Sequence, residues 1–313
     1  MYIGIDLGGT NIAAALVDES GRIVKRASIP ANAGGGAQVV IGGLVRVCDV
    51  LLCEETVTPL SIGIGVPGSV DDEAGEVVFT PNLPFKHTNI TRELHAKFGC
   101  PIRLGNDANC AALGETITGG AKGASDVVFI TLGTGLGGGI IIGGRLHTGL
   151  TGQASELGHI VVKIGGRECG CGRRGCWERY ASASGLIRTA IEFMRSDSES
   201  ALWELCGAKE ENVDGRMIFE AYRAGDSIAM LAVGRYIEDL AAGVVNIINT
   251  LEPEMVCVGG GISNAWDCIE EPLRKLVDEE KYYRFSPEAP QTRIVKAQLG
   301  NDAGIIGAAL LGV

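Results

Sequence analysis

Two stretches of this sequence repeat one pattern, in which a strand, a glycine-rich turn and a second strand follow one another. Residues 2–17 read YIGIDLGGTNIAAALV, and residues 126–142 read DVVFITLGTGLGGGIII. Apolar runs interrupted by glycines are typical of strands joined by tight turns. Because a repeated unit of this kind indicates internal duplication, we expect two related lobes that face a shared cleft.

The rest of the chain predicts an α/β fold built around these two blocks. We expect strands at 2–7, 12–17, 22–29, 60–66, 101–104, 126–132, 140–142, 255–258 and 292–297, and helices at 38–53, 91–98, 108–118 and 303–311. The first three strands, joined by short turns, form an antiparallel meander, and residues 182–249 are mostly helical. We place a small lobe at residues 1–106, joined by the C-terminal helix at 303–313, and a large lobe at residues 107–302.

Composition limits the class of protein. The chain has 313 residues, enough for two domains, and a formal net charge of −11, which argues against a broad nucleic-acid or anionic-membrane surface. The first residues contain no basic leader, and no apolar run reaches the length of a membrane span. We therefore expect a cytoplasmic protein that binds neither nucleic acid nor membrane. Ten cysteines in such a chain do not indicate a disulfide framework.

Three glycine-rich turns that follow strands predict a site for nucleotide phosphates, because backbone without side chains lets several N–H groups point at phosphate oxygens. The residues concerned are Gly8, Gly9, Thr10 and Asn11 in the first turn, Gly133, Thr134 and Gly135 in the second, and Gly260 and Gly261 in the third. The plainer alternative is that the glycines only make hairpins. A dinucleotide fingerprint is excluded, since a strand at 140–142 follows Gly133-x-Gly135-x-x-Gly138 where a helix would be needed, and no P-loop is present.

Two acidic residues at strand ends are candidates for phosphoryl-transfer chemistry. Asp107 follows Asn106 where a strand ends and a helix begins, so it either caps the helix or accepts a hydroxyl proton from a substrate that Asn106 also binds. Asp6 stands one residue before the first phosphate turn, either as an ordinary strand-end aspartate or as a residue that holds Mg²⁺ through water.

One imidazole and three thiols form a complete ligand set for zinc. His159 is followed by Cys169, Cys171 and Cys176, with glycines between the cysteines, and four protein ligands leave no position for an activated water. We therefore predict a structural Zn²⁺ site. The alternatives are three incidental thiols, which the interleaved glycines disfavour, and a nucleic-acid zinc knuckle, which the acidic composition disfavours.

Taken together, these motifs resemble the ROK family of sugar kinases, and within it the bacterial ROK glucokinases, over nearly the whole chain. The resemblance rests on Asp6-Leu7-Gly8-Gly9-Thr10-Asn11, Gly105-Asn106-Asp107-Ala108-Asn109, Leu132-Gly133-Thr134-Gly135, Glu156-x-Gly158-His159 and Cys169-x-Cys171-x4-Cys176-x-Glu178. It implies the duplicated actin-like ATPase fold, with ATP and Mg²⁺ in the cleft. It also implies Asp107 as the catalytic base and a set of sugar ligands, namely Asn106, Asp107, Glu156, His159, Glu178, Gly68, Asn82 and Gly135.

The activity that the resemblance implies is ATP-dependent phosphorylation of glucose at the 6-hydroxyl. N-acetylmannosamine, N-acetylglucosamine or another hexose is the alternative substrate, and a non-catalytic sugar sensor is the alternative class. ROK repressors carry a DNA-binding segment before the first glycine turn, which here begins at residue 6, so we expect an enzyme. The resemblance further suggests a dimer or tetramer. Zinc would also fix the angle of Glu156 and Glu178 toward the sugar, while His159 binds the metal with one ring nitrogen and a hydroxyl with the other.

Overall fold

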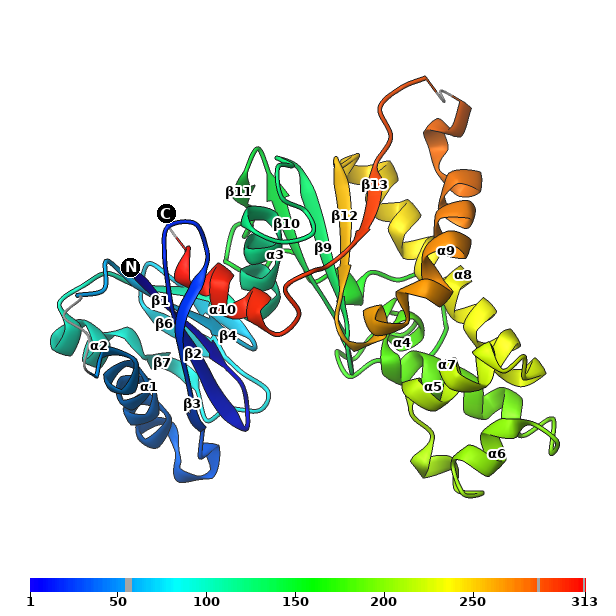
Figure 1. The fold of residues 1–313 in the computed structure, drawn as a ribbon, viewed down its shortest axis with the longest axis horizontal. Coiled ribbons are helices and arrows are strands. Elements are labelled where there is room, and N and C mark those ends of the chain that lie inside the picture. The colour runs from blue at the N-terminus through cyan, green and yellow to red at the C-terminus, as the bar shows by residue number, and fades with distance from the viewer. Residues whose placement is uncertain (54–57, 286–287, 312) are drawn as a thin grey trace. The chain divides into compact units, whose positions relative to one another are not determined.

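A computed structural model describes residues 1–53, 58–285, 288–311 and 313 (Figure 1). The first sheet has the order β3-β2-β1-β4-β8. Its strands are β1 (Tyr2–Leu7), β2 (Asn11–Val17), β3 (Ile23–Pro30), β4 (Ile62–Val66) and β8 (Ile102–Asn106). The first three form the predicted antiparallel meander, and β4 and β8 then run parallel to β1.

The second sheet repeats this topology. Its order is β11-β10-β9-β12-β13, formed by β9 (Val127–Leu132), β10 (Leu136–Ile142), β11 (Arg145–Leu146), β12 (Met255–Gly259) and β13 (Arg293–Lys296). β10 and β11 are antiparallel, whereas β12 and β13 are parallel. In both sheets, three strands consecutive in the chain are followed by two that arrive after long connections. The duplication expected from the glycine-rich blocks is therefore confirmed.

Most predicted strands differ from the observed ones by one or two residues at an end, but one strand start is clearly wrong. Residues 133–139 were expected to form one turn before a strand at 140–142, but the turn ends at Gly135 and β10 begins at Leu136. Packing explains the last glycine of this run, since a Cβ on Gly139 would lie 2.4 Å from Cβ of Ala112. That glycine permits close contact with a helix and does not make a turn.

The helices and the remaining strands fill in around these sheets. The first half contains α1 (Ala37–Leu52), α2 (Thr91–Phe98) and α3 (Asp107–Ile117), together with a small antiparallel sheet of β5 (Ser69–Asp71), β6 (Glu76–Phe79) and β7 (Lys86–Asn89). The second half contains α4 (Glu178–Ala181), α5 (Ala183–Met194), α6 (Ala201–Leu205), α7 (Gly215–Arg223), α8 (Ser227–Leu251) and α9 (Trp266–Glu280), and α10 (Asp302–Ala309) closes the chain. The small sheet, β11 and α9 were not predicted. No helix in the described ranges combines the length and apolar character that crossing a bilayer requires.

The two faces of the first sheet are covered by different helices. On β1, Ile3 and Ile5 are fully buried in a core that includes Leu44 of α1. Gly4, between them, points to the other face, where a Cβ would meet the carbonyl oxygen of Ile305 in α10 at 1.9 Å. Alternation along the strand thus places α1 on one face and α10 on the other. Figure 1 shows α10 in red beside the strands of this sheet.

Contacts divide the chain into two compact units. The first comprises residues 1–129, 138–155 and 297–313, and the second comprises 130–137 and 156–296. The unit boundary differs from the predicted lobe boundary at residue 107, because α3 packs tightly on α10: a Cβ on Gly307 would lie 1.7 Å from the carbonyl oxygen of Cys110. The division into lobes at 106/107 stays a prediction.

Candidate functional site

In the first unit, strand register brings several predicted site residues to one edge of the sheet. Asp6 of β1 is paired with Gly65 of β4, which is paired with Gly105 of β8. The carboxyl ends of these three parallel strands therefore lie side by side, and they lead into the first glycine turn, Gly68 and Asn106-Asp107. This edge is where ligands bind in sheets of parallel strands.

The structure shows which of Asn106 and Asp107 caps the helix α3, a question that the sequence left open. Asn106 is the N-cap of α3, and its Oδ1 accepts hydrogen bonds from the backbone N–H groups of Ala108 at 3.0 Å and Asn109 at 3.2 Å. Its Nδ2 donates to the carbonyl oxygen of Gly68 at 3.1 Å, which leaves one amide N–H for a ligand. Asp107 is the first residue of the helix, and its Oδ1 also accepts a bond from the N–H of Ala108, at 2.8 Å. The capping role considered for Asp107 thus falls mainly to Asn106.

Asp6 is held in an environment that disfavours its charge. Burial raises the pKa of Asp6 to about 6, and the negative charge of Asp107 contributes to the same shift. Its carboxyl group lies beneath α10, where a Cβ on Gly304 would be 3.7 Å from Cγ of Asp6. Asp6 and Asp107 are two carboxylates that influence each other beside a glycine turn, and a cation would stabilise their ionised forms.

The first glycine turn opens on a pocket of about 620 Å³. The turn is closed by a hydrogen bond from the N–H of Gly8 to the carbonyl oxygen of Asn11 at 2.9 Å. The predicted residues Asp6, Gly8, Gly9, Thr10 and Asn11 all line the pocket. Exposed Asn82 lies across from the turn, with its Cβ 3.7 Å from the position of a Cβ on Gly9.

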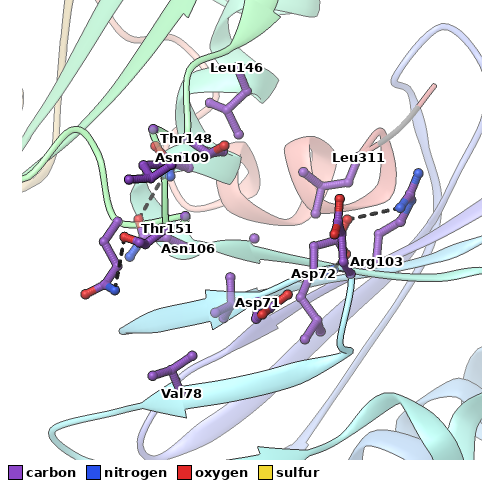
Figure 2. Close-up of a pocket in the computed structure, with 18 residues that line it drawn as sticks. Asp71, Asp72, Val78, Arg103, Asn106, Asn109, Leu146, Thr148, Thr151 and Leu311 are labelled. Atoms are coloured by element: carbon purple, nitrogen blue, oxygen red, sulfur yellow. Dashed lines mark hydrogen bonds and ion pairs between the residues drawn. The ribbon is translucent and has the colours of Figure 1, made fainter.

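A second cavity of about 710 Å³ adjoins Asn106 in the same unit. Figure 2 shows Asn106 and Asn109 near Thr148 and Thr151 on one side of it, and the Asp72–Arg103 ion pair on the other. Asn109 is 2% exposed, and its Oδ1 has no hydrogen-bond partner in the described structure. A buried acceptor without a partner is rare because its desolvation is not compensated. The sequence marked Asn109 only as part of a motif and did not predict this cavity.

In the second unit, the turn between β9 and β10 is tied to Glu178. The Oε2 atom of this carboxylate accepts a hydrogen bond from the N–H of Leu136 at 3.2 Å. A Cβ on Gly135 would lie only 2.5 Å from that oxygen. The turn is also anchored from the other side, where Ser184 Oγ donates to the carbonyl oxygen of Thr134 at 2.8 Å. Gly135 is therefore required for the carboxylate to reach the turn.

The third glycine turn lies beside the second. Gly260 follows β12 with φ of 83°, and a Cβ there would lie 2.5 Å from the backbone nitrogen of Leu132 at the end of β9. Gly261 has open space where its Cβ would be. Neighbouring strands β9 and β12 thus end in adjacent bare turns that include Gly133, Thr134, Gly260 and Gly261.

The four predicted zinc ligands converge. One ligand atom from each of His159, Cys169, Cys171 and Cys176 lies within 4.8 Å of the others. The Sγ atoms of Cys171 and Cys176 are 3.6 Å apart, as are Sγ of Cys169 and Nδ1 of His159. A tetrahedron around zinc with bonds of roughly 2.3 Å has edges of about 3.7 Å. The residues therefore fit a four-coordinate zinc ion.

The cluster of predicted zinc ligands contacts the predicted sugar ligands, and His159 belongs to both sets. Cys169 Sγ is 3.8 Å from Oε1 of Glu178. His159 directs Nδ1 toward the sulfur of Cys169, so its Nε2 is left for another partner. His159 also donates its backbone N–H to the carbonyl oxygen of Glu156 at 3.0 Å. Glu156, His159 and Glu178 are thus connected to the metal cluster within one unit.

The comparisons with known proteins agree with these motifs. A model of the ROK family matches residues 2–312. A glucokinase of Thermotoga maritima is 39% identical over 98% of this chain and 95% of its own length. An N-acetyl-D-glucosamine kinase of Aliivibrio fischeri is 32% identical over 100% of this chain and 99% of its own length.

A comparison with a solved structure supports the predicted fold. The crystal structure of a ROK family glucokinase from Streptomyces griseus, in complex with glucose and AMPPNP, superposes with a TM-score of 0.80 at 36% identity, covering 99% of this chain and 98% of that one. The predicted fold class is therefore confirmed as the α/β actin-like ATPase fold. On all these grounds, the chain belongs to the ROK family.

Proposed function

We propose that this protein transfers the γ-phosphoryl group of ATP to the 6-hydroxyl of glucose. The observation that carries the proposal is the edge formed by β1, β4 and β8, where Asp6, the phosphate turn and Asn106-Asp107 stand together. Glucokinase is the name of the Thermotoga relative, and the Streptomyces griseus enzyme binds glucose with an ATP analogue.

Asp107 accepts the proton of the 6-hydroxyl as the phosphoryl group arrives. An aspartate is a weak base, but the loose transition state of phosphoryl transfer leaves the hydroxyl little changed until late. Position therefore matters more than basicity. Asn106, held by its cap and by Gly68, donates its remaining amide N–H to the same sugar.

Asp6 is the residue that would hold Mg²⁺ through water. When bound, that ion neutralises charge on the donor's phosphates and on the two carboxylates. The raised pKa of Asp6 supports this assignment, since burial and the charge of Asp107 disfavour its ionised form, which a cation would stabilise. The turns at Gly8–Asn11, Gly133–Gly135 and Gly260–Gly261 supply backbone N–H groups to the nucleotide.

We assign the hydroxyls of the sugar to Glu156, His159 and Glu178, and we keep Gly68, Asn82 and Gly135 as further sugar ligands. Zinc supplies rigidity here, since its four protein ligands leave no position for water. His159 uses Nδ1 for the metal and donates from Nε2 to a hydroxyl.

N-acetylglucosamine or N-acetylmannosamine is the second candidate substrate. The cavity beside Asn106 is favourable to it, because the buried Oδ1 of Asn109 needs a donor and an acetamide provides an N–H. Glucose offers a hydroxyl at the same carbon, so both sugars remain in the proposal, with glucose first.

Two further parts of the proposal concern location, which follows from the donor, and assembly, which the resemblance to the family suggests. Because ATP is the donor, we place the enzyme in the cytoplasm. A homodimer or homotetramer is the proposed assembly, with sugar and nucleotide as the small-molecule partners and no role for nucleic acid or membrane.

A panel of sugars and donors on the purified protein tests the function. Coupled ADP release should show the highest kcat/KM with glucose and ATP. Higher kcat/KM with an N-acetylhexosamine would make that sugar the substrate. Tight sugar binding without turnover by any donor would refute the enzyme and indicate a sugar-sensing regulator.

A further inference from the structure

Arg26 lies on the sheet face that carries the nucleotide pocket. The register pairs Gly4 of β1 with Ala15 of β2, and Ala15 with Arg26 of β3. Residues directly opposite one another in neighbouring strands share a face. Gly4 points to α10, so Arg26 stands on the α10 face too. It lines the 620 Å³ pocket together with the phosphate turn.

Asp302 holds the guanidinium of Arg26. Arg26 Nη2 donates to Oδ2 of Asp302 at 2.8 Å, and Nη1 donates to Oδ1. Asp302 opens α10, a helix whose position is fixed by the close approach of its backbone to Gly4 of β1 and Gly63 of β4. The side chain of Arg26 is 56% exposed. Although solvent reaches it, its guanidinium is anchored by a carboxylate on a rigidly packed helix.

A polyphosphate bound in this pocket would need a positive charge nearby, and Arg26 provides one. Among the described residues that line it, Arg26 is the single cation, and Asp6 and Asp302 are carboxylates. The turn from Gly8 to Asn11 has no basic residue, so its N–H groups meet a polyphosphate without a compensating charge. Two of the five guanidinium N–H groups bind Asp302, which leaves three for phosphate oxygens.

A purely stabilising role accounts poorly for this placement. Ion pairs between exposed side chains contribute little to stability, and the chain has similar pairs far from any turn of this kind, such as Arg22 with Asp18 at 3.0 Å. What distinguishes the Arg26–Asp302 pair is its position in the wall of the phosphate pocket.

We propose that Arg26 binds the polyphosphate of the donor nucleotide and that Asp302 is a positioning residue that orients its guanidinium. The inference rests on the proposed function, because it takes the pocket to be the donor site. It adds a charged phosphate ligand to a site otherwise made of backbone N–H groups and Asp6.

Titration calorimetry with ADP and with adenosine separates phosphate binding from general damage to the pocket. Charge-assisted hydrogen bonds of this kind predict that Arg26→Ala weakens ADP binding about tenfold to hundredfold, while adenosine binding stays within about twofold. Arg26→Lys, which keeps the charge but not the planar fork, should lose less. Asp302→Asn should weaken ADP binding by a smaller factor than Arg26→Ala.

Steady-state kinetics give a second readout. Arg26→Ala should raise the KM for ATP and leave the KM for the sugar unchanged. Arg22→Ala, which removes the matched exposed pair outside the pocket, should change neither.

Three results would overturn the inference. Unchanged ADP affinity in Arg26→Ala would remove the phosphate contact. An equal loss of adenosine affinity would make the residue merely structural, and tighter ADP binding in Asp302→Asn would contradict its positioning role. If the wild-type protein binds neither ADP nor ATP, the proposed function itself fails, which is a distinct outcome.

Discussion

Replacing Asp6 with asparagine should stabilise the protein while it disables the enzyme. Burial raises the pKa of Asp6 from 3.8 to about 6, with a smaller contribution from Asp107. The folded state therefore binds a proton more tightly than the unfolded state does. Stability from this group is complete below about pH 4 and is lost as the pH rises through 6. An asparagine side chain at this position would keep the shape of the aspartate without its charge.

The size of the effect follows from the shift. A difference of about 2.2 pKa units corresponds to about 3 kcal/mol when the carboxyl is fully ionised. The linkage relation gives about 1.6 kcal/mol at pH 5 and about 3 kcal/mol at pH 8, as upper values for a group with some access to water. Asp6→Asn should raise the free energy of unfolding by amounts that grow over this range.

Urea unfolding of both proteins between pH 5 and pH 8 provides the measurement. Mg²⁺ should be left out because it would stabilise the ionised carboxylate, and chelators should be avoided because they would strip zinc. Glu19→Gln, at an exposed carboxylate in the turn between β2 and β3, is the control and should change stability little at any pH. A variant that is no more stable than wild type at pH 8, or a gain that does not vary with pH, would refute the reasoning.

Three further variants test other parts of the structure. Asp107→Asn should lower kcat by about 10²- to 10⁴-fold while sugar affinity by calorimetry and the thermal unfolding temperature stay near wild type; a wild-type rate would exclude Asp107 as the base. Cys171→Ser should reduce the zinc content, measured by atomic absorption, and should weaken sugar binding more than ATP binding. An equal loss of both affinities would mean that the metal only stabilises the fold. Gly307→Ala should unfold at lower temperature, by at least several degrees, because its Cβ would overlap the carbonyl oxygen of Cys110 at 1.7 Å; an unchanged melting temperature would mean that α10 can shift at no cost.

The sequence predicted correctly those helices and strands whose bounds depend only on residues within or next to them. β1 begins and ends where alternation and the following glycines place it, and α2 runs from Thr91 to Phe98 as predicted. The run at 133–139 misled because glycine has two uses that look alike in a sequence. Gly135 serves a turn, whereas Gly139 makes room for α3, and only the packing partner distinguishes them.

The site was predictable where motifs are continuous and not where it depends on contacts between distant segments. Zinc ligands close in sequence were recognised, and their atoms converge. Arg26 and Asp302 gave no such indication, because they are far apart in the chain and each is an ordinary surface residue by its neighbours. Asn109 was part of a recognised motif. That its Oδ1 is buried without a partner could not be predicted, because its burial depends on segments that only the folded chain brings together.

The zinc loop and the glycine turn at Gly135 are connected through Glu178, so we expect a metal in that loop to affect more than stability. Glu178 contacts both, since one of its oxygens lies 3.8 Å from Cys169 Sγ and the other accepts the N–H of Leu136. Zinc would fix the sulfur of Cys169 beside this carboxylate and so limit where Glu178 can lie, while Glu178 holds the turn at Gly135. A displacement of the zinc loop should therefore move the proposed sugar ligand Glu178 together with the proposed phosphate turn. For this reason we expect loss of zinc to be detected first in sugar affinity.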